Sequence, residues 1–497
     1  MRAPIVPWIL LLVSTSVAPA RADAPANVVF IHPDGASLSS WGVARTYWVG
    51  PDADLAWDRM PFMAAYRGHM SDRLGGTSNG GATSHAFGVR VRAAGSFGRD
   101  GAWEDARPIR AASGYDGSLL REAANTGHPV GLVNDGDLPE PGTGAFWAEA
   151  QHRDEAAEIA RQFVDGRPGH EGEDVRPVVA LGGGEAFFLP AGAPPCGDAL
   201  DPDCAAHVDP LDGATASRTD GRNLIRELLD DGWVVLRTRT EFEACVERVR
   251  REPDWTPRVL GLFAASDVFN DTEEEDLIAA GLIRDHAPEG DPKAGRLVAF
   301  GSRDRGHGHH PPRAEEMHAL ALELLRRHAE RAGKPFFLVT EIESVDNFGN
   351  GNNAAGMLLG LRSADRVIDA TLDFVEEEPR TFVLTAADSD ASAIQIVSPA
   401  RERVSVNPTG DGSDRVLAPT DGRRGRGSEP FVSAPDASGR TMEFTIAWAG
   451  TNDFSGGVLS RFAGHRAEEV QRRFATRFDN TDVYRVMRAV LLGEEMP

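Results

Sequence analysis

Acidic and amide side chains gather directly after several hydrophobic runs in this sequence of 497 residues. Asp34 follows NVVFIHP, whereas Asp388 and Asp390 follow TFVLTAA. A single aspartate after a strand usually caps a helix or forms a turn. Several strand ends of this kind are harder to explain in that way, because converging carboxylates repel one another unless a cation holds them. The pattern therefore favours a metal site, to which further residues after two other strands could contribute: Glu341, Glu343, Asp346, Asn350, Asn452 and Asp453.

A second candidate lies in the small-residue segment GGTSNGGATSHAFGVR, residues 75–90. Small residues let the backbone approach a ligand closely, and the N–H groups of a helix that begins near Ser78 would point at an anion. From the sequence alone, Ser78 is a nucleophile, a helix N-cap or both. The motif is loose, and a simple Gly/Ser loop also explains it.

The hydrophobic runs and the patterns between them predict an α/β fold. Runs broken by Gly or Pro are typical of buried strands that end in loops, and here they alternate with helical patterns. This alternation predicts a three-layer α/β/α sandwich whose central sheet is mostly parallel, with active groups at the carboxyl ends of the strands. The predicted strands are 27–35, 128–137, 176–188, 258–266, 334–344 and 380–390, and the predicted helices are 155–163, 222–230, 315–332, 357–375 and 482–492.

Composition and charge restrict the class of partner. Hydrophobic residues make up 41% of the chain and charged residues 26%, and the formal net charge is −24. Such a surface repels nucleic acid and anionic membranes, so we expect neither as a partner. The length can hold one large α/β domain. We predict a single domain over 25–497, with loop insertions near 191–220, 301–312 and 400–440.

The first 24 residues have the layout of a secretory signal peptide. Arg2 precedes an apolar run at 5–13, and small residues precede a plausible cleavage position near 22–24. The apolar run is too short to cross a membrane comfortably. We therefore expect an exported, soluble protein that is periplasmic or extracellular.

The cysteines and a histidine cluster have simpler explanations than catalysis. In an oxidising compartment Cys196 and Cys204 could close a short disulfide around GDALDPD, and the alternative is two free thiols. Cys245 lies on a helical pattern, which predicts a small buried hydrophobic residue. The cluster GHGHH, residues 306–310, lies among Gly, Pro and Arg without supporting acids, so a solvated loop is favoured over a metal site.

The order of these motifs resembles that of the alkaline phosphatase family over nearly the whole mature chain. NVVFIHPDG is similar to the family's opening strand, which implies that Asp34 is the metal-bridging aspartate. TSNGGATSHAFGV is similar to the nucleophile segment DSAASATAWSTGV, so that Ser78 falls on the nucleophilic serine and Thr77 on the aspartate before it. FFLVTEIESVDN resembles FFLMVEGGRIDH, which implies that Glu341 is the magnesium-site glutamate and Asp346 a zinc-site aspartate.

The resemblance also implies a phosphate clamp and a threonine ligand. Arg153 falls where the family keeps the arginine that grips the substrate phosphate, and a planar guanidinium suits two phosphate oxygens. The alternative is a surface arginine paired with Asp154 or Glu149. Thr143 matches the magnesium-site threonine with a shift of one residue, and Glu140 is an alternative carboxylate nearby.

The sequence departs from the family at every expected zinc histidine. These histidines fall on Asn350, on Asp388 and near Asp453, although a one-residue shift would instead place Asp388 on the family's aspartate and Ser389 on the histidine. Imidazole suits zinc, whereas carboxylate, amide and water oxygens suit Mg²⁺, Ca²⁺ or Mn²⁺. We therefore expect divalent metal ions, with Mg²⁺, Ca²⁺ or Mn²⁺ favoured over Zn²⁺. The expected metal-site residues are Asp34, Ser78, Thr143, Glu341, Asp346, Asn350, Asp388 and Asp453.

Taken with the resemblance, these residues imply an exported, metal-dependent hydrolase of small-molecule phosphate monoesters. Ser78 would form a phosphoserine that is then hydrolysed, and dimers are common in the family. Two alternatives stay open: a phosphodiesterase or sulfatase on the same scaffold, and a non-catalytic relative that binds phosphate or cations. The retention of Asp34, Ser78, Glu341 and Asp346 favours an active enzyme.

Overall fold

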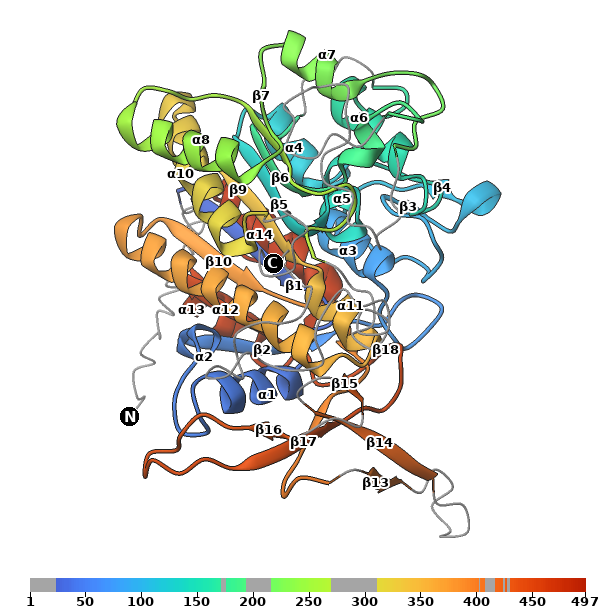
Figure 1. The fold of residues 1–497 in the computed structure, drawn as a ribbon. Helices are drawn as coiled ribbons and strands as arrows, with labels where there is room; N and C mark the ends of the chain where they lie inside the picture. The colour runs from blue at the N-terminus through green and yellow to red at the C-terminus, as the bar shows by residue number, and fades with distance from the viewer. Residues whose placement is uncertain are drawn as a thin grey trace, which may run out of the picture.

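A computed structural model describes residues 24–170, 176–193, 216–269, 311–401, 403–406, 416–422, 425–426 and 430–497. A large sheet runs through the middle of this part of the chain (Figure 1). Its strands are β1 (Asn27–Pro33), β2 (Phe62–Arg67), β5 (Val130–Asp137), β6 (Val179–Gly183), β7 (Val234–Leu236), β8 (Val259–Leu262), β9 (Phe337–Ile342), β10 (Thr381–Thr385), β19 (Leu459–Gly464) and β20 (Phe478–Asp479).

The strand order in this sheet is β20-β2-β19-β10-β1-β9-β5-β6-β8-β7. The strands from β10 to β7 in that order all pair in parallel. Strand β19 is antiparallel to both β10 and β2. The prediction of a mostly parallel central sheet is confirmed.

Helices cover both faces of the sheet because alternate residues of each buried strand point to opposite sides. In β1, Val29 and Ile31 belong to one hydrophobic core, whereas Val28 and Phe30 belong to the other. The first core is covered by α1 (Leu38–Trp48), α8 (Arg239–Arg251), α10 (Ala314–Ala332) and α12 (Ala354–Glu377). The second is covered by α3 (Ser78–Phe87), α4 (Leu119–Asn125), α5 (Pro141–Trp147), α6 (Ala156–Asp165), α7 (Leu224–Asp230), α13 (Ala467–Phe474) and α14 (Asn480–Leu492).

The predicted strands and helices coincide with observed ones, and local chemistry adjusts their ends. Helix α12 begins three residues before its predicted start, because the Asn353 side chain accepts a hydrogen bond from the Gly356 N–H at 3.0 Å. Cys245 is buried in α8 as predicted, and burial raises the pKa of its thiol to about 11. Among the described helices, none combines the length and apolarity needed to cross a bilayer.

The segment near 400–440 differs from the sequence prediction of a loop insertion. Its described part contributes to a smaller antiparallel sheet, which lies beside α1 at the bottom of Figure 1. The strands of this sheet are β12 (Gln395–Val397), β13 (Arg403–Val406), β14 (Val416–Gly422), β15 (Gly425–Arg426), β16 (Phe431–Val432) and β17 (Glu443–Ala447). These segments are strands because they pair with one another across long sequence separations. Their local composition, rich in Gly, Pro and charged residues, gives no sign of this pairing.

Several predictions concern residues outside the described part of the chain. These are residues 1–23 of the predicted signal peptide, the pair Cys196 and Cys204, and the histidine cluster at 306–310.

Candidate metal and phosphate site

Carboxylates from β1 and β9 meet at the carboxyl edge of the central sheet. The two strands pair in parallel, with His32 opposite Glu341, and Asp34 directly follows β1. Glu343 follows β9, and Asp346 lies in the next helix, α11 (Ser344–Asn350). One carboxylate oxygen from each of Asp34, Glu343 and Asp346 lies within 4.8 Å of the other two. The sheet thus brings Asp34 to two buried acids, Glu343 and Asp346, that lie about 300 residues further along the chain.

Many oxygens of this cluster are buried and lack a hydrogen-bond partner among the described residues. Burial raises the pKa of Glu343, and the neighbouring charge of Glu341 raises it further. Buried, unpaired carboxylates are costly, and a divalent cation satisfies them with the oxygen ligands that Mg²⁺ and Ca²⁺ take. The residues present therefore fit a divalent cation. The unpartnered oxygens are Asp34 Oδ2, Glu341 Oε1, Glu343 Oε2, Asp346 Oδ1 and both carboxylate oxygens of Asp388.

Asp388 joins the cluster from the loop after β10 and faces Asp34. Burial raises the pKa of Asp388, and the charge on Asp34 raises it further. Burial alone would also raise the pKa of Asp34, but its interaction with the neighbouring Asp388 carboxyl and the charge on His32 lower it below the ordinary value. The pKa values of these two neighbouring carboxyls are therefore shifted in opposite directions.

Asp346, Asn350 and Asp453 form the next part of the site. The Asn350 Nδ2 group donates hydrogen bonds to Asp346 Oδ2 at 3.0 Å and to Asp453 Oδ1 at 2.9 Å. Asp453 reaches this position through a short antiparallel ladder between β11 (Asp390–Ala391) and β18 (Asp453–Phe454). The Asn350 amide oxygen accepts a hydrogen bond from Ser392 Oγ at 3.2 Å. In this arrangement the amide nitrogen bridges the two carboxylates.

Glu341 and Thr143 are linked by Asn134, a residue that the sequence analysis did not single out. The Asn134 amide donates to Glu341 Oε2 at 2.6 Å and to Thr143 Oγ1 at 3.0 Å. Thr143 itself donates to the Leu138 carbonyl at 2.9 Å. Burial raises the pKa of Glu341 to about 8, although the positive charge on His32 opposes this shift. The signal for Asn134 was the polar run NDGD at the end of a hydrophobic strand.

Helix α5 approaches Glu341 so closely that only glycine fits at one position. A Cβ atom on Gly142 would lie 1.5 Å from Glu341 Oε1. Such a distance is far inside van der Waals contact, so any larger residue must displace the helix or the carboxylate. Gly142 therefore allows Thr143 and Glu341 to lie in neighbouring positions.

Ser78 is the first residue of α3 and is 6% exposed. The N-cap is Thr77, whose side chain accepts a hydrogen bond from the Gly80 N–H at 3.4 Å. Of the roles that the sequence left open for Ser78, the N-cap is therefore wrong, because the helix begins at Ser78 itself, one residue earlier than that role requires. A Cβ atom on Gly81 would lie 2.3 Å from Asp388 Cβ, so the first turn of α3 packs directly on this acid.

Arg153 forms an ion pair with Glu140. Its partner is not Asp154 or Glu149, which were the expected partners of a surface arginine. The distance from Arg153 Nη2 to Glu140 Oε2 is 2.6 Å, and 34% of the arginine side chain is exposed. The charge on Glu140 raises the pKa of Arg153 most, and the charges on Glu343, Asp34 and Asp346 raise it further. The guanidinium therefore lies within the electric field of the carboxylate cluster.

His32 is a second residue of the site that the sequence analysis did not single out. Its Nδ1 atom lies 2.7 Å from the Ala386 carbonyl oxygen, and its Nε2 atom lies 3.5 Å from Asp34 Oδ1. Burial lowers its pKa, but the charges on Asp34 and Glu341 prevail and raise it to about 9. A histidine two residues before Asp34 was the available signal, since both side chains of a strand then share one face.

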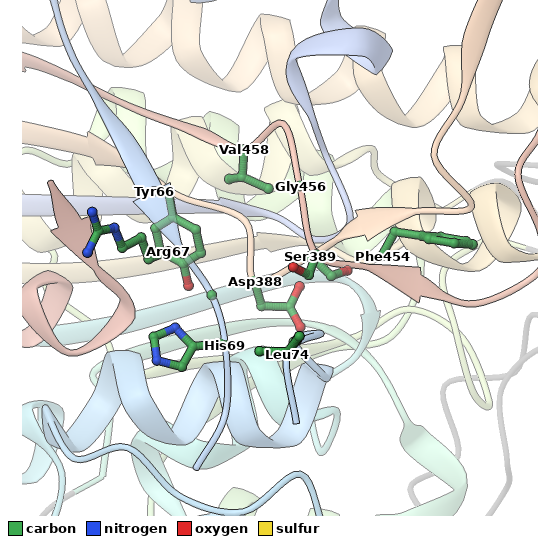
Figure 2. A pocket seen from close by; sticks show the side chains of 12 residues that line it. Tyr66, Arg67, His69, Leu74, Asp388, Ser389, Phe454, Gly456 and Val458 are labelled. Atoms are coloured by element: carbon green, nitrogen blue, oxygen red, sulfur yellow. The ribbon is translucent and has the colours of Figure 1, made fainter. Parts of the chain in front are cut away.

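A pocket of about 340 Å³ opens beside Asp388 (Figure 2). Figure 2 shows the Asp388 side chain between Tyr66 on one side and Ser389 on the other. The volume lies at the low end of the range for small-molecule sites. The other residues that line the pocket include basic and apolar ones: Arg67, His69, Leu74, Phe454 and Val458.

The fold and this site define an α/β enzyme whose functional groups lie at the carboxyl edge of a parallel sheet. Comparison with known proteins gives the family. The model of the alkaline phosphatase family matches residues 25–410. The chain therefore belongs to the alkaline phosphatase family and is a phosphoric monoester hydrolase of that type.

Two curated relatives are phosphatases. The chain is 27% identical over 391 residues to streptomycin-6-phosphate phosphatase of Streptomyces griseus, covering 75% of this chain and 74% of that protein. It is 23% identical over 373 residues to the repressible alkaline phosphatase of Saccharomyces cerevisiae, covering 74% of this chain and 55% of that protein.

Solved structures of alkaline phosphatases share the fold. The enzyme from Thermus thermophilus matches with a TM-score of 0.62 at 18% identity, over 99% of this chain and 97% of that one. The enzyme from the Antarctic bacterium TAB5 matches with a TM-score of 0.61 at 15% identity, over 95% and 99%. A variant of the TAB5 enzyme has Mg bound in its M3 site.

Proposed function

We propose that this protein is an exported, metal-dependent hydrolase of small-molecule phosphate monoesters, with Ser78 as the nucleophile. The observation that carries the proposal is the packing of the first turn of α3, which begins at Ser78, on Asp388 of the carboxylate cluster. The N-terminus of this helix would favour an anionic phosphate, because the first N–H groups of a helix have no partner within it. Membership of the alkaline phosphatase family supports this chemistry.

In the proposed reaction Ser78 Oγ attacks the phosphorus atom and the ester alcohol departs in line. The product of this step is a phosphoserine, which water hydrolyses to inorganic phosphate and free serine. Arg153 would bind phosphate oxygens, and two observations support this role: its guanidinium is partly exposed, and the charges of the carboxylate cluster act on it. The phosphate would compete with Glu140 for this guanidinium.

Divalent cations, when bound, supply positive charge that neutralises the phosphate oxygens and lowers the pKa of a coordinated hydroxyl. The residues proposed to hold them are Asp34, Ser78, Thr143, Glu341, Asp346, Asn350, Asp388 and Asp453. All of these residues offer a side-chain oxygen, which supports Mg²⁺, Ca²⁺ or Mn²⁺ in preference to Zn²⁺. Elemental analysis of the purified protein tests this preference, and a full complement of zinc would contradict it.

The pocket beside Asp388 is the proposed place for the alcohol part of the substrate. Leu74, Phe454 and Val458 provide apolar surface there, and Arg67 provides a positive charge. These groups favour an alcohol with an apolar body that carries a polar or anionic substituent. The relative that is a streptomycin-6-phosphate phosphatase supports a phosphorylated small molecule as the substrate.

Export is proposed from the layout of residues 1–24, with the charged start, short apolar run and small residues noted above. Mass spectrometry of the N-terminus of protein recovered outside the cytoplasm tests this part. A start near residues 23–25 is expected, and an intact Met1 would contradict processing.

The nucleophile is tested by comparing Ser78→Ala with Ser84→Ala. Both serines lie on α3, but the Ser84 hydroxyl donates to the Gly80 carbonyl at 2.9 Å and has no proposed role in catalysis. We expect Ser78→Ala to lower kcat by about 10³-fold or more and to abolish labelling of the protein by ³²P-labelled substrate. Near-normal turnover by Ser78→Ala would contradict the proposal.

The class of ester is tested with matched aryl phosphate, phosphate diester and sulfate substrates. We expect the monoester to be hydrolysed with the highest kcat/KM. A higher kcat/KM for the diester or the sulfate would favour the corresponding alternative enzyme. Phosphate binding without turnover, with every divalent metal added, would favour a non-catalytic relative.

A further inference from the structure

We propose that His32 is a nitrogen ligand of the cation held between Asp34 and Glu341. This inference rests on the metal-dependent function proposed above and adds a ligand that the expected metal-site residues do not include. Two independent observations support it: the convergence of three potential ligand atoms, and a buried imidazole nitrogen without a hydrogen-bond partner.

The pairing of β1 with β9 brings the three side chains together. His32 and Asp34 are two residues apart at the end of β1, so their side chains leave the same face of the sheet. Glu341 is the parallel partner of His32 on β9 and shares that face. One ligand atom from each of the three residues lies within 4.8 Å of the other two. Atoms bound to one ion at about 2.1 Å are roughly 3 to 4.2 Å apart, so small movements complete the site.

The ring of His32 is held so that Nε2 faces the carboxylates. Nδ1 lies 2.7 Å from the Ala386 carbonyl oxygen, which can only accept a hydrogen, so Nδ1 carries the proton. A histidine that binds a metal typically donates its other ring N–H to a carbonyl or carboxylate in this way.

The Nε2 atom of His32 has no hydrogen-bond partner among the described residues, although the side chain is fully buried. Its distance of 3.5 Å from Asp34 Oδ1 exceeds that of an ordinary hydrogen bond. A buried polar atom of this kind requires an explanation. A cation between Nε2 and the two carboxylates provides one.

His85 lies beside His32 but has a different environment, which makes it a matched control. Its Nε2 atom lies 2.7 Å from the Tyr66 hydroxyl oxygen. Its ring meets that of His32 edge to face, with the ring centroids 5.3 Å apart. His85 therefore packs against the His32 ring. It does not belong to the cluster of His32, Asp34 and Glu341.

A nitrogen ligand changes which cation this edge of the site prefers. Imidazole binds Mn²⁺, Co²⁺ and Zn²⁺ better than it binds Mg²⁺ or Ca²⁺, which prefer oxygen. The cation at His32, Asp34 and Glu341 is thus expected to be softer than a cation bound only by Asp346, Asn350 and Asp453. The two parts of the site are therefore expected to prefer different cations. The expected replacement of the family's zinc histidines by oxygen donors does not predict this difference.

The test uses Mn²⁺ added to full-length protein from which divalent cations have been removed. Pulsed EPR detects the ¹⁴N nucleus of an imidazole bound to Mn²⁺, and titration calorimetry gives the Kd. We expect ¹⁴N coupling in the wild type and in His85→Gln, and its loss in His32→Gln. We also expect His32→Leu to weaken Mn²⁺ binding by about tenfold or more, and Mg²⁺ binding less.

Several results would overturn the proposal. One is a wild-type protein that binds no Mn²⁺ or binds it without ¹⁴N coupling, and another is coupling that persists in His32→Gln. A third is equal or tighter Mn²⁺ binding by His32→Leu, which would show that the imidazole opposes the cation. His32→Gln preserves the polar volume of the side chain, so a comparison of its thermal unfolding with that of the wild type separates loss of the fold from loss of a ligand.

The outcome is distinguishable from failure of the proposed function. A wild type that hydrolyses phosphate monoesters but shows no ¹⁴N coupling would refute only the role of His32. A Ser78→Ala variant that retains turnover would refute only the nucleophile, because Mn²⁺ binding with ¹⁴N coupling does not require that hydroxyl.

Discussion

The amide nitrogen of Asn350 lies 3.0 Å from a carboxylate oxygen of Asp346, one helical turn before it on α11. The same nitrogen donates to Asp453, so a neutral amide separates two acids. Without it, the two carboxylates would repel each other across a buried space. The position of Asn350 is therefore suited either to a hydrogen-bond bridge or to a cation.

Replacing Asn350 by Asp is expected to make the protein depend on divalent cations for stability. Three acids would then converge, which lowers the melting temperature of the cation-free protein. Mg²⁺ or Ca²⁺ should raise that temperature by more than in the wild type, because the variant offers an additional hard ligand. Differential scanning calorimetry with and without each cation measures both effects. Asn223→Asp at the N-cap of α7 is the control, and an equal response of the two variants would contradict a cation at Asn350.

Gly142→Ala is expected to disrupt the site while Gly42→Ala does not. The added Cβ at position 142 would overlap Glu341 Oε1, whereas a Cβ at position 42 on α1 has no heavy atom within 4 Å. We expect Gly142→Ala to lower kcat/KM by about 100-fold and Gly42→Ala to be neutral or to stabilise the protein by about 0.5–1 kcal/mol. Steady-state kinetics and urea unfolding of both variants test this. Full activity in Gly142→Ala would mean that Glu341 is not held as described.

Arg153→Ala is expected to lower kcat/KM by about 10- to 100-fold, which corresponds to the loss of one or two charge-assisted hydrogen bonds to phosphate. Arg153→Lys should recover only part of this loss, because an ammonium group cannot bind two oxygens with the geometry of a guanidinium. Arg161→Ala on α6 is the control, since Arg161 pairs with Glu158 and Asp165. The inhibition constant of inorganic phosphate should rise in the two Arg153 variants and not in Arg161→Ala. Equal constants for the wild type and all three variants would refute binding of phosphate by Arg153.

His318 is expected to make the fold sensitive to acid. It is fully buried between Thr340 and Thr371, with a ring nitrogen 2.8 Å from each hydroxyl oxygen, and burial lowers its pKa to about 3. Between pH 3 and the ordinary pKa near 6.5, the unfolded chain therefore binds a proton that the folded protein excludes. The stability contributed by the neutral ring is complete above pH 6.5 and is lost by about 1.4 kcal/mol per pH unit as the pH falls from there toward 3.

The variant His318→Leu separates this titration from the hydrogen bonds of the ring. We expect it to unfold more easily than the wild type at pH 7, because two threonine hydroxyls lose a partner. Between pH 4.5 and 6.5 its unfolding free energy should fall less steeply than that of the wild type. Urea unfolding at several pH values measures both, and identical slopes would show that His318 does not titrate as described.

The alternation of strands and helices, and the acids that follow the strands, were predictable because they depend on residues close in sequence. β1, β5, β9 and β10 lie within their predicted ranges, and hydrophobic periodicity is local information. The smaller sheet was not predictable, since β14 and β17 are strands through pairing with each other. The match of motif order likewise predicted Asp34, Ser78 and Asp346 as site residues, because motif order can be read along the chain.

The sequence alone determined the residue types at the strand ends, which are mainly oxygen donors, and hence the class of chemistry predicted for the site. The tertiary structure decided which donors meet. It brought His32 beside Glu341 and inserted Asn134 between Glu341 and Thr143, and it paired Arg153 with Glu140. Strand register and helix packing fix these contacts between residues that can lie 200 or more positions apart, and no local pattern encodes a register.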